Sequence, residues 1–303
     1  MERHEDDLRD FGAIVARLAQ GLDLSRVEAR DCWHQILQET QPALQQGAFI
    51  AALKAKGETL DEIAGTFEAL YEYDTLKVTL EASGPLIDNC GTGADVLKTF
   101  NISTGAAIVA CGVRVVRHAA RAISSNCGAV DVIEALGVNV ESVPELPKQS
   151  IEHAGIGVWN AFLPSIHPGI ARLMRGIRFG STINLVGPLL NPTMPDHKVM
   201  GVSSRKLVDL ELQILKALRF KRAFVMHGID EATGKGMDEA STLGRTHVAE
   251  LFSDGRTDNY TIIPEDLGLR RANAIELASS RHVSTRRGTT STRYRWPRRR
   301  FTN

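Results

Sequence analysis

The chain has 303 residues, of which 43% are apolar and 24% are charged, so it is long enough for two modest domains that each bury a core. Its 36 Lys and Arg residues balance 36 Asp and Glu residues, but residues 281–303 hold eight arginines and no acidic residue, which leaves residues 1–280 with a net charge of −8. These values exclude fibrous repeats and an extended disordered chain for residues 1–280.

The first part of the chain has apolar residues at spacings of three and four and few turn residues, a pattern typical of amphipathic helices. Two helix starts carry the capping-box pattern, because Ser25 precedes Glu28 by three residues and Thr59 precedes Glu62 by three. We therefore predict a small helical domain over residues 1–80. Its expected helices lie within 11–21, 24–38, 42–58 and 59–73.

From Pro85 onward, short apolar or β-branched runs alternate with amphipathic stretches and glycine-rich turns, which predicts an α/β domain over residues 81–280. We expect part of 160–185 to pack with the helical domain. Residues 281–303 have almost no apolar periodicity, so we interpret them as a disordered or aberrant basic tail. The expected strands are 86–90, 112–116, 155–162, 198–203 and 222–228, and the expected helices are 103–112, 129–137, 144–154 and 204–219.

Cysteine usage and hydropathy indicate a cytoplasmic protein. The four cysteines form no C-x-x-C pair, as expected for reduced thiols rather than a zinc or disulfide scaffold. The N-terminal segment is charged, and no apolar run approaches the ~18–20 residues that a transmembrane helix needs. We therefore expect no membrane partner.

A glycine-rich turn at 91–95 follows the first expected strand, and a helix is expected to begin near Ser103. Glycines let backbone N–H groups approach a ligand closely, and a helix N-terminus adds partial positive charge, so together they suit a phosphate. The turn lacks the dinucleotide-binding pattern, since Val96 stands where a third glycine would be needed, and no P-loop lysine follows. A plain tight turn is the alternative at this point.

Two further polar clusters have residue types that suit an anionic substrate. Residues 117–126 contain two arginines, a histidine and two serines near the end of the second expected strand, and a solvated basic loop is their alternative interpretation. His118 alone is more typical of a hydrogen-bonded structural histidine. Asp238 and Glu239 follow a later strand and suit Mg²⁺, which bridges carboxylates to phosphates, although such a pair alone is usually surface charge.

In this order, the clusters resemble the anthranilate phosphoribosyltransferase family of nucleoside phosphorylase-like phosphoribosyltransferases. That family carries G-T-G-G-D, T-x-N-x-S-T, K-H-G-N-R-x-x-S-S, N-x-L-G-P-L-x-N-P and G-x-D-E. The corresponding segments here are GTGAD at 91–95, TFNIST at 99–104, RHAARAISS at 117–125, NLVGPLLNP at 184–192 and GMDE at 236–239. The resemblance extends over about residues 8–280.

The resemblance implies a small helical domain joined to a larger α/β domain with a mixed central sheet, and a homodimer. It implies phosphoribosyl pyrophosphate, anthranilate or a related aromatic amine, and Mg²⁺ as ligands, with no covalent nucleophile. The implied phosphoribosyl pyrophosphate contacts are Gly91, Ala94, Asp95, Thr99, Asn101, Ile102, Ser103, Thr104, Arg117, His118, Arg121, Ser124, Ser125 and Ala129. The implied acceptor contacts are Gly91, Ala120 and Arg175, and the implied metal ligands are Ser103, Asp238 and Glu239.

The chain departs from the family pattern mainly on the acceptor side. Ala119 and Ala120 replace the Gly-Asn pair, whose Asn contacts anthranilate in the family, and Ala94 replaces the fourth residue of the glycine turn. The segment that supplies the arginine for the anthranilate carboxylate is about two or three residues shorter, with Arg175 the best match and Arg178 the rival.

Two alternatives to anthranilate transfer stay open at this point. One is a phosphoribosyltransferase with a different aromatic or amine acceptor, which the two alanines favour. The other is a non-catalytic relative that binds nucleic acid through Arg117, Arg121 and the basic tail, with affinity that falls steeply with salt. We rank it lower, because Asp238 and Glu239 would repel a phosphate backbone.

Overall fold

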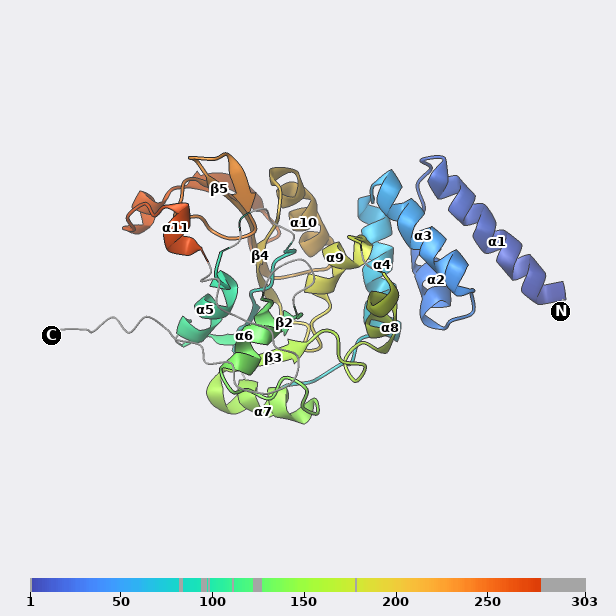
Figure 1. Ribbon diagram of the computed structural model, residues 1–303, viewed down its shortest axis with the longest axis horizontal. Coiled ribbons are helices and arrows are strands. Elements are labelled where there is room, and N and C mark those ends of the chain that lie inside the picture. The colour runs from blue at the N-terminus through green and yellow to red at the C-terminus, as the bar shows by residue number, and fades with distance from the viewer. Residues whose placement is uncertain are drawn as a thin grey trace.

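The computed structural model describes residues 2–81, 84–93, 97, 99–110, 112–121, 127–177 and 179–278. It places a small helical part beside a larger part built around one sheet (Figure 1). The helical part begins with α1 (Glu2–Ala19), α2 (Arg26–Leu37), α3 (Ala43–Lys56) and α4 (Leu60–Tyr73).

Both capping boxes that the sequence predicted are confirmed. The side chain of Ser25 accepts from the Glu28 backbone at the start of α2, and Thr59 does the same for Glu62 at the start of α4. Satisfying these N–H groups allows each helix to begin where its apolar face begins. The apolar faces then bury Trp33, Phe49 and other side chains in one core.

The sheet is mixed, as the resemblance implied, and its main order is β3-β2-β1-β4-β5-β7-β8, with β6 paired to β5. Strands β1 to β5 pair in parallel, whereas β5 pairs with both β6 and β7 antiparallel, as does β7 with β8. The strands are β1 (Leu86–Asp88), β2 (Arg114–Ala119), β3 (Ile156–Asn160), β4 (His197–Gly201), β5 (Arg222–Asp230), β6 (Lys235–Met237), β7 (Thr246–Leu251) and β8 (Thr257–Ile262).

Helices accompany the sheet and connect its strands. Helices α5 and α6 lie on the side of the sheet away from the helical part (Figure 1). Helix α7 packs against β3. Helix α10 packs against β5 and β7 and also contacts α4 of the helical part (Figure 1). The helices are α5 (Ile102–Val109), α6 (Ala129–Ala135), α7 (Glu145–Ala154), α8 (Pro168–Gly176), α9 (Thr182–Val186), α10 (Arg205–Ala217) and α11 (Ala274–Leu277), with short 3-10 turns η1 (Gly187–Leu189) and η2 (Pro264–Leu267). In the part of the chain described here, no helix is both long and apolar enough to cross a membrane.

One hydrophobic core joins the helical part to the sheet. It runs from Leu70 of α4 through Val186 of α9 and Leu212 of α10 to Val225 of β5. Burial of apolar surface is the main stabilising term in folding, so a shared core fixes the helical part against this side of the sheet.

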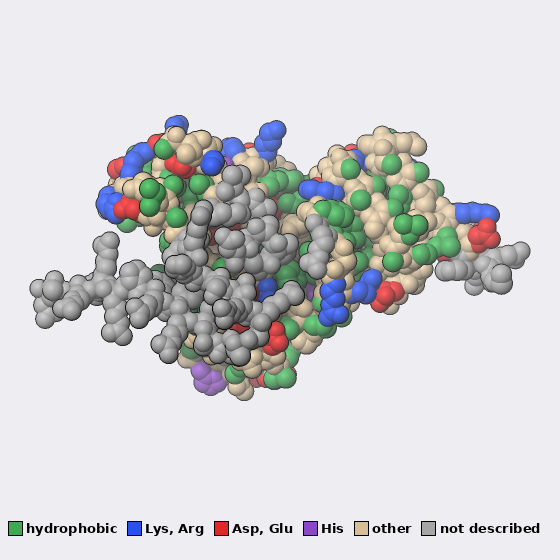
Figure 2. Space-filling model, viewed as in Figure 1, with side chains coloured by type: hydrophobic (Ala, Val, Ile, Leu, Met, Phe, Trp, Pro, Cys, Tyr) green, Lys and Arg blue, Asp and Glu red, His purple; other side chains and the backbone are tan. Residues whose placement is uncertain are grey.

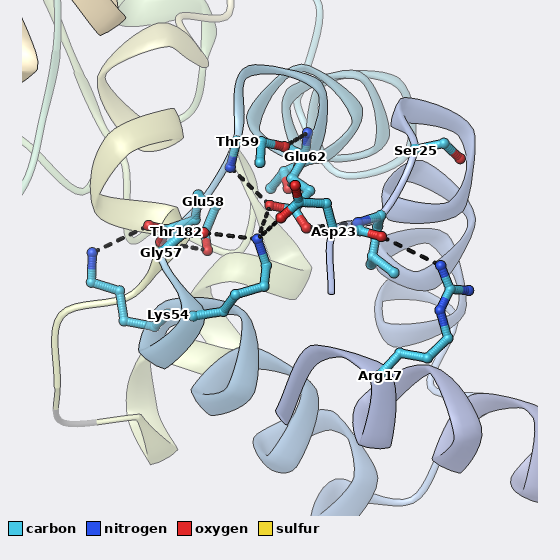
Figure 3. A network of polar contacts seen from close by, with 12 residues as sticks. Arg17, Asp23, Ser25, Lys54, Gly57, Glu58, Thr59, Glu62 and Thr182 are labelled. Atoms are coloured by element: carbon cyan, nitrogen blue, oxygen red, sulfur yellow. Dashed lines mark hydrogen bonds and ion pairs between the residues drawn. The ribbon is translucent and has the colours of Figure 1, made fainter. Parts of the chain in front are cut away.

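Polar contacts reinforce the same junction. Thr182, at the start of α9, donates at 3.0 Å to Glu58, which lies between α3 and α4 (Figure 3). Within the helical part, Lys56 pairs with buried Glu62 at 2.9 Å. On α8, the N–H groups of Gly169 and Ile170 donate to the carboxylate of Asp74. A carboxylate at a helix N-terminus satisfies unpaired N–H groups and complements the helix dipole.

The sheet order creates a reversal point at β1. The chain passes from β1 to β2 and β3 on one side, then crosses to β4 on the other side of β1. In open α/β sheets, a crevice forms outside the carboxyl ends of the two strands where the order reverses, and ligands bind there. The ends of β1 and β4 therefore mark the place to look for a site.

Candidate functional site

Residues 91–93 of the glycine turn lie at this reversal point, shortly after the end of β1 at Asp88. Its Thr92 N–H donates to Gly201 O at the end of β4, at 2.9 Å. A Cβ on Gly91 would lie 2.8 Å from Gly201 O and 2.9 Å from Asp238 Oδ2, and Gly93 has φ of +64°. The turn therefore needs glycine at 91 for close approach and at 93 for its backbone conformation.

Polar side chains of α5 and β2 meet beside the turn. Helix α5 begins at Ile102, so Ser103 and Thr104 lie in its first turn. The guanidinium of Arg117, which is buried, donates to Thr104 Oγ1 at 2.5 Å and to Ser103 Oγ at 2.9 Å. Two hydroxyls, a helix N-terminus and an arginine thus share one location, as a phosphate-binding site requires.

Strand β2 is longer than the sequence predicted. It runs to Ala119 instead of ending at 116, so Arg117 and His118 belong to the strand rather than to a loop after it. Pairing with β3 continues through Ala119 and accounts for the extension. The strand directs Arg117 towards α5.

Asp238 and Glu239 lie at the same place, beyond β6. Asp238 Oδ2 accepts from the Gly93 N–H at 2.8 Å, and Glu239 Oε1 accepts from the Ser103 N–H at 3.2 Å. The structure thus brings the acidic pair to the glycine turn and the start of α5, although these contacts join residues 145 and 136 positions apart in sequence. Burial and the neighbouring charge of Asp238 raise the pKa of Glu239 to about 8, against the opposing effect of Arg117.

The donor set at the acidic pair fits Mg²⁺. Carboxylate and hydroxyl oxygens are hard ligands, and Mg²⁺ commonly uses one or two carboxylates while water and substrate phosphates complete its shell. A cation beside the pair would offset the repulsion that raises the pKa of Glu239. Among the residues that the structure describes, no group of three or more His, Cys, Asp or Glu side chains could hold a metal.

In this structure, the protein's own carboxylates occupy the N–H groups that suit a phosphate. Gly93 N–H binds Asp238, and Ser103 N–H binds Glu239. A bound polyphosphate could take these N–H groups if the two carboxylates turned to a cation. The geometry therefore places candidate groups for an anion and for a divalent cation next to each other.

Residues 99–101, just before α5, are held by later parts of the chain. Thr99 forms an isolated antiparallel bridge with Ala278, and Phe100 N–H donates to Leu277 O at 3.0 Å. Asn101 donates to Cys127 O at 3.3 Å. Predicted contacts Ala94, Asp95, Ser124 and Ser125, and the alternative Arg178, lie outside the described residues.

Two other predicted contacts have protein partners here. Arg121 forms ion pairs with Glu134, Glu141 and Asp131 on and beyond α6, which raise its pKa. His118 is buried, and its Nδ1 lies 2.9 Å from Gly187 O.

A carbonyl can only accept, so His118 carries its proton on Nδ1. Its Nε2 then accepts from His167 Nε2 at 2.8 Å. Burial lowers the pKa of His118 to about 3, so the ring is neutral at pH 7. The predicted binding role of His118 remains a prediction, as does that of Arg121.

The predicted acceptor contacts lie on different elements. Ala120 follows β2, and its carbonyl accepts from Val130 N–H at 3.3 Å, near Ala129 at the start of α6. Arg175 is exposed in the last turn of α8, a helix that Asp74 holds to the helical part. Any acceptor contact of Arg175 would therefore come from the side of the helical part.

Sequence reasoning missed two residues that shape the site. A Cβ on Gly201 would lie 1.4 Å from Asp238 O, so this glycine allows the acidic pair to approach β4. Asn89 donates to Ser103 O at 2.8 Å and joins the turn to α5. A glycine that closes an apolar strand was the available signal for Gly201; Asn89 carried no signal beyond its place before the turn.

Comparisons with known proteins agree with this fold. Residues 13–73 match the helical bundle domain of the glycosyl transferase family, and residues 83–287 match its a/b domain. The anthranilate phosphoribosyltransferase of Anaeromyxobacter dehalogenans (strain 2CP-C) is 43% identical over 87% of this chain and 77% of its own length. That of Methanococcoides burtonii is 41% identical over 87% of this chain and 73% of its own length.

Solved structures show the same relationship. Anthranilate phosphoribosyltransferase from Thermus thermophilus superposes with a TM-score of 0.75 at 33% identity, covering 88% of this chain and 78% of that one. The Saccharomyces cerevisiae enzyme in complex with PRPP and Mg has a TM-score of 0.73 at 24% identity, covering 89% and 77%, and supports the fold.

The two-part fold and these matches thus define a glycosyl transferase made of a helical bundle domain and an a/b domain. Within that class, the chain belongs to the anthranilate phosphoribosyltransferase family and is a phosphoribosyltransferase.

Proposed function

We propose that this protein transfers the phosphoribosyl group of phosphoribosyl pyrophosphate to anthranilate, with Mg²⁺ as cofactor and pyrophosphate as leaving group, in tryptophan biosynthesis. One observation carries the proposal: the glycine turn, the start of α5, Arg117 and the Asp238-Glu239 pair converge at the reversal point of the sheet. The relatives are anthranilate phosphoribosyltransferases, and one solved relative contains PRPP and Mg. The expected homodimer and the cytoplasmic location remain predictions.

The residues at this site have the properties that the reaction requires. The bond from the anomeric carbon to pyrophosphate breaks, and the electron pair leaves with pyrophosphate. The amine nitrogen forms the new bond with its lone pair and then loses one proton. Charge therefore develops on pyrophosphate, where the N–H groups of Gly93 and Ser103 and the guanidinium of Arg117 would bind and orient it.

The acidic pair would complete the donor site, which is the site for phosphoribosyl pyrophosphate, the donor of the phosphoribosyl group. Asp238 and Glu239 would hold Mg²⁺, with Ser103 as a further oxygen ligand. When bound, the metal supplies positive charge that stabilises the leaving group. A covalent nucleophile is unnecessary, because positioning and charge stabilisation suffice for this displacement.

A different aromatic amine is the second candidate acceptor, and the two alanines at the end of β2 favour it. Ala119 is buried against Val130, Ile133 and Val140, and Ala120 offers no side-chain amide where the family pattern has Asn. Losing one hydrogen bond to the acceptor costs on the order of 0.5–1.5 kcal/mol, which weakens anthranilate binding without abolishing it.

The nucleic-acid alternative finds less support on the surface. On the face shown in Figure 2, Lys and Arg side chains of the described residues are scattered among acidic and apolar ones and form no continuous basic surface. A basic patch or stripe is the usual footprint of nucleic-acid binding.

The test is pyrophosphate release by the purified full chain given phosphoribosyl pyrophosphate and Mg²⁺, with and without anthranilate. We expect anthranilate-dependent release, and we expect it to fall at least about 100-fold in Asp238→Asn/Glu239→Gln, since both proposed metal ligands lose their charge. The matched control is Glu265→Gln/Asp266→Asn, an exposed adjacent acidic pair in η2.

Each outcome separates the candidates. Release only with another aromatic amine would favour the second candidate. Release that is unchanged in the Asp238/Glu239 variant would rule out the metal site, and no release with any amine would contradict the proposed reaction.

A further inference from the structure

The segment NLVGPLLNP (184–192), which gave the sequence one of its family motifs, has no role in the site described above. Its carbonyl and amide groups bind two strands of the sheet. Asn191 donates to Val116 O of β2 at 3.1 Å, and Gly187 O pairs with His118 of the same strand. Pro188 O accepts from Lys198 Nζ of β4 at 2.5 Å. The segment is therefore joined to strands on both sides of β1.

Lys198 also binds β1 itself. Its ammonium lies 2.8 Å from Asp88 Oδ2, and both side chains are buried, with exposures of 0% and 1%. Asp88 is the last residue of β1 and stands opposite Lys198 in the register. One buried cation thus connects the end of β1, the start of β4 and the carbonyl of Pro188.

Asp88 is the counter-charge of this lysine. Glu211 of α10 is also buried and interacts electrostatically with Lys198, but neither of its oxygens has a hydrogen-bond partner among the described residues. Burial raises the pKa of Glu211 to about 8, so this carboxyl is mainly protonated at pH 7. The charge on Lys198 is therefore balanced by Asp88.

A buried ion pair is weak as a source of stability. Removing two charges from water is costly, and apolar residues of similar volume often give equal or greater stability. The pair contributes more to geometry than to stability. Two charge-assisted hydrogen bonds fix the Lys198 ammonium relative to Asp88 and Pro188. The position of β1 relative to β4 follows from these contacts.

The donor site depends on that position. Gly91 lies three residues beyond Asp88, and Gly201 lies three residues beyond Lys198. A Cβ at Gly91 would come within 2.8 Å of Gly201 O, and one at Gly201 within 1.4 Å of Asp238 O, so the turn and the acidic pair meet with no spare space. A displacement of β1 along β4 by a fraction of an ångström would change the contact of Gly93 with Asp238.

We propose that Lys198 is a positioning residue for the phosphoribosyl pyrophosphate site: by binding Asp88 and Pro188 O together, it holds the glycine turn in register with the acidic pair. The proposal rests on the proposed function for its kinetic test. Lys198 does not itself contact substrate, and its effect reaches the turn through β1.

The first test is Lys198→Met in the full chain, which keeps the length of the side chain and removes its hydrogen bonds. We expect the KM for phosphoribosyl pyrophosphate to rise at least about tenfold, while the KM for anthranilate changes less than about threefold. We also expect faster hydrogen–deuterium exchange at residues 88–93. The matched control is Glu211→Gln, a buried change beside the same lysine. It should leave both KM values and the hydrogen exchange at residues 88–93 unchanged.

A double variant separates positioning from stability. In Asp88→Leu/Lys198→Met, apolar side chains replace the ion pair, so we expect the Tm to recover relative to Lys198→Met. The raised KM and the fast exchange should persist, because no contact restores the register. Recovery of all three quantities would show a merely structural role and overturn the proposal, as would a wild-type KM and exchange in Lys198→Met.

Asp88→Asn removes the charge from the contact with Lys198 but keeps the size and shape of the side chain. This variant replaces the methionine variants in the test if they do not fold. Its exchange at 88–93 should be intermediate, and wild-type exchange would again overturn the proposal. Hydrogen exchange needs no turnover. If the wild-type chain releases no pyrophosphate, the proposed function fails, and exchange alone decides the role of Lys198.

Discussion

Burial shifts the pKa values of three side chains of this protein far from their usual values. Burial raises the pKa of Glu211 and of Glu239 to about 8, whereas it lowers the pKa of His118 to about 3. Desolvation disfavours the charged form in each case, which is why acids shift up and the histidine shifts down. The carboxyls of Glu211 and Glu239 are therefore mainly protonated at pH 7, where an exposed glutamate is ionised.

The raised pKa of Glu211 predicts a pH dependence of stability. The folded protein keeps this proton up to about pH 8, while the unfolded chain releases it near 4.5. The folded state thus binds more protons between these values, and the free energy of unfolding falls as pH rises through this window. We expect Glu211→Gln to show a smaller fall in Tm than wild type from pH 5 to pH 8, by a few °C.

The measurement is thermal denaturation with a chelator present, which removes divalent cations from the acidic pair. Glu145→Gln, at an exposed position of α7, should retain the wild-type slope. Parallel Tm curves for Glu211→Gln and wild type would contradict the assignment of a shifted Glu211.

Close approach between elements decides the shape of the site. The glycine turn, the end of β4 and the acidic pair come from three separate elements, and they contact one another through backbone atoms at Gly91 and Gly201. Such contacts leave no room for a side chain, so a glycine here is a requirement of packing. The same argument does not extend to a glycine such as Gly47, where an added Cβ would meet nothing within 4 Å.

Gly201→Ala tests this contact. Its Cβ would lie 1.4 Å from Asp238 O, so the backbone at 238 must move. We expect destabilisation of ~1–3 kcal/mol, the usual cost of overpacking, and a rise of at least about tenfold in the KM for phosphoribosyl pyrophosphate. Urea denaturation and initial rates measure the two effects.

The control is Gly47→Ala within α3, which should stabilise the helix by ~0.5–1 kcal/mol and leave kinetics unchanged. A Gly201→Ala protein with wild-type KM would show that the acidic pair tolerates displacement.

The molecule as a whole behaves as two parts with a shared core. Apolar contacts run from α4 through α9 and α10 to β5, and Asp74 caps α8 across the same junction. Helix α8 carries Arg175, so the position of the predicted acceptor contact depends on how the helical part is seated.

A continuous core predicts that both parts unfold together. Trp33 is buried in the helical part and Trp159 is buried in β3, so each can report on one part. The third tryptophan, Trp296, is replaced in both test proteins, so that one tryptophan remains in each. We expect Trp159→Phe/Trp296→Phe and Trp33→Phe/Trp296→Phe each to give a fluorescence midpoint within about 2 °C of its own far-UV circular dichroism midpoint. Separate midpoints in either protein would contradict a single cooperative unit.

Local sequence patterns predicted much of the fold and part of the candidate site. Each capping box spans four consecutive residues, and the helices α2 and α4 begin where these boxes predict. The glycine turn and the acidic pair were recognisable because their residue types suit phosphate and metal. Strand β8 was not predicted: its residues TDNYTI are mostly exposed and show no apolar alternation, so pairing with β7 alone makes them a strand.

The residue order of this chain therefore specified the helical part, the α/β alternation and the glycine turn, because propensity, capping and turn chemistry act between near neighbours. Folding alone brought Asp238 to Gly93, Lys198 to Asp88 and Gly201 to Asp238, since strand order and register set contacts between residues far apart in sequence. Such contacts depend on which strands become neighbours, and no local pattern encodes that choice.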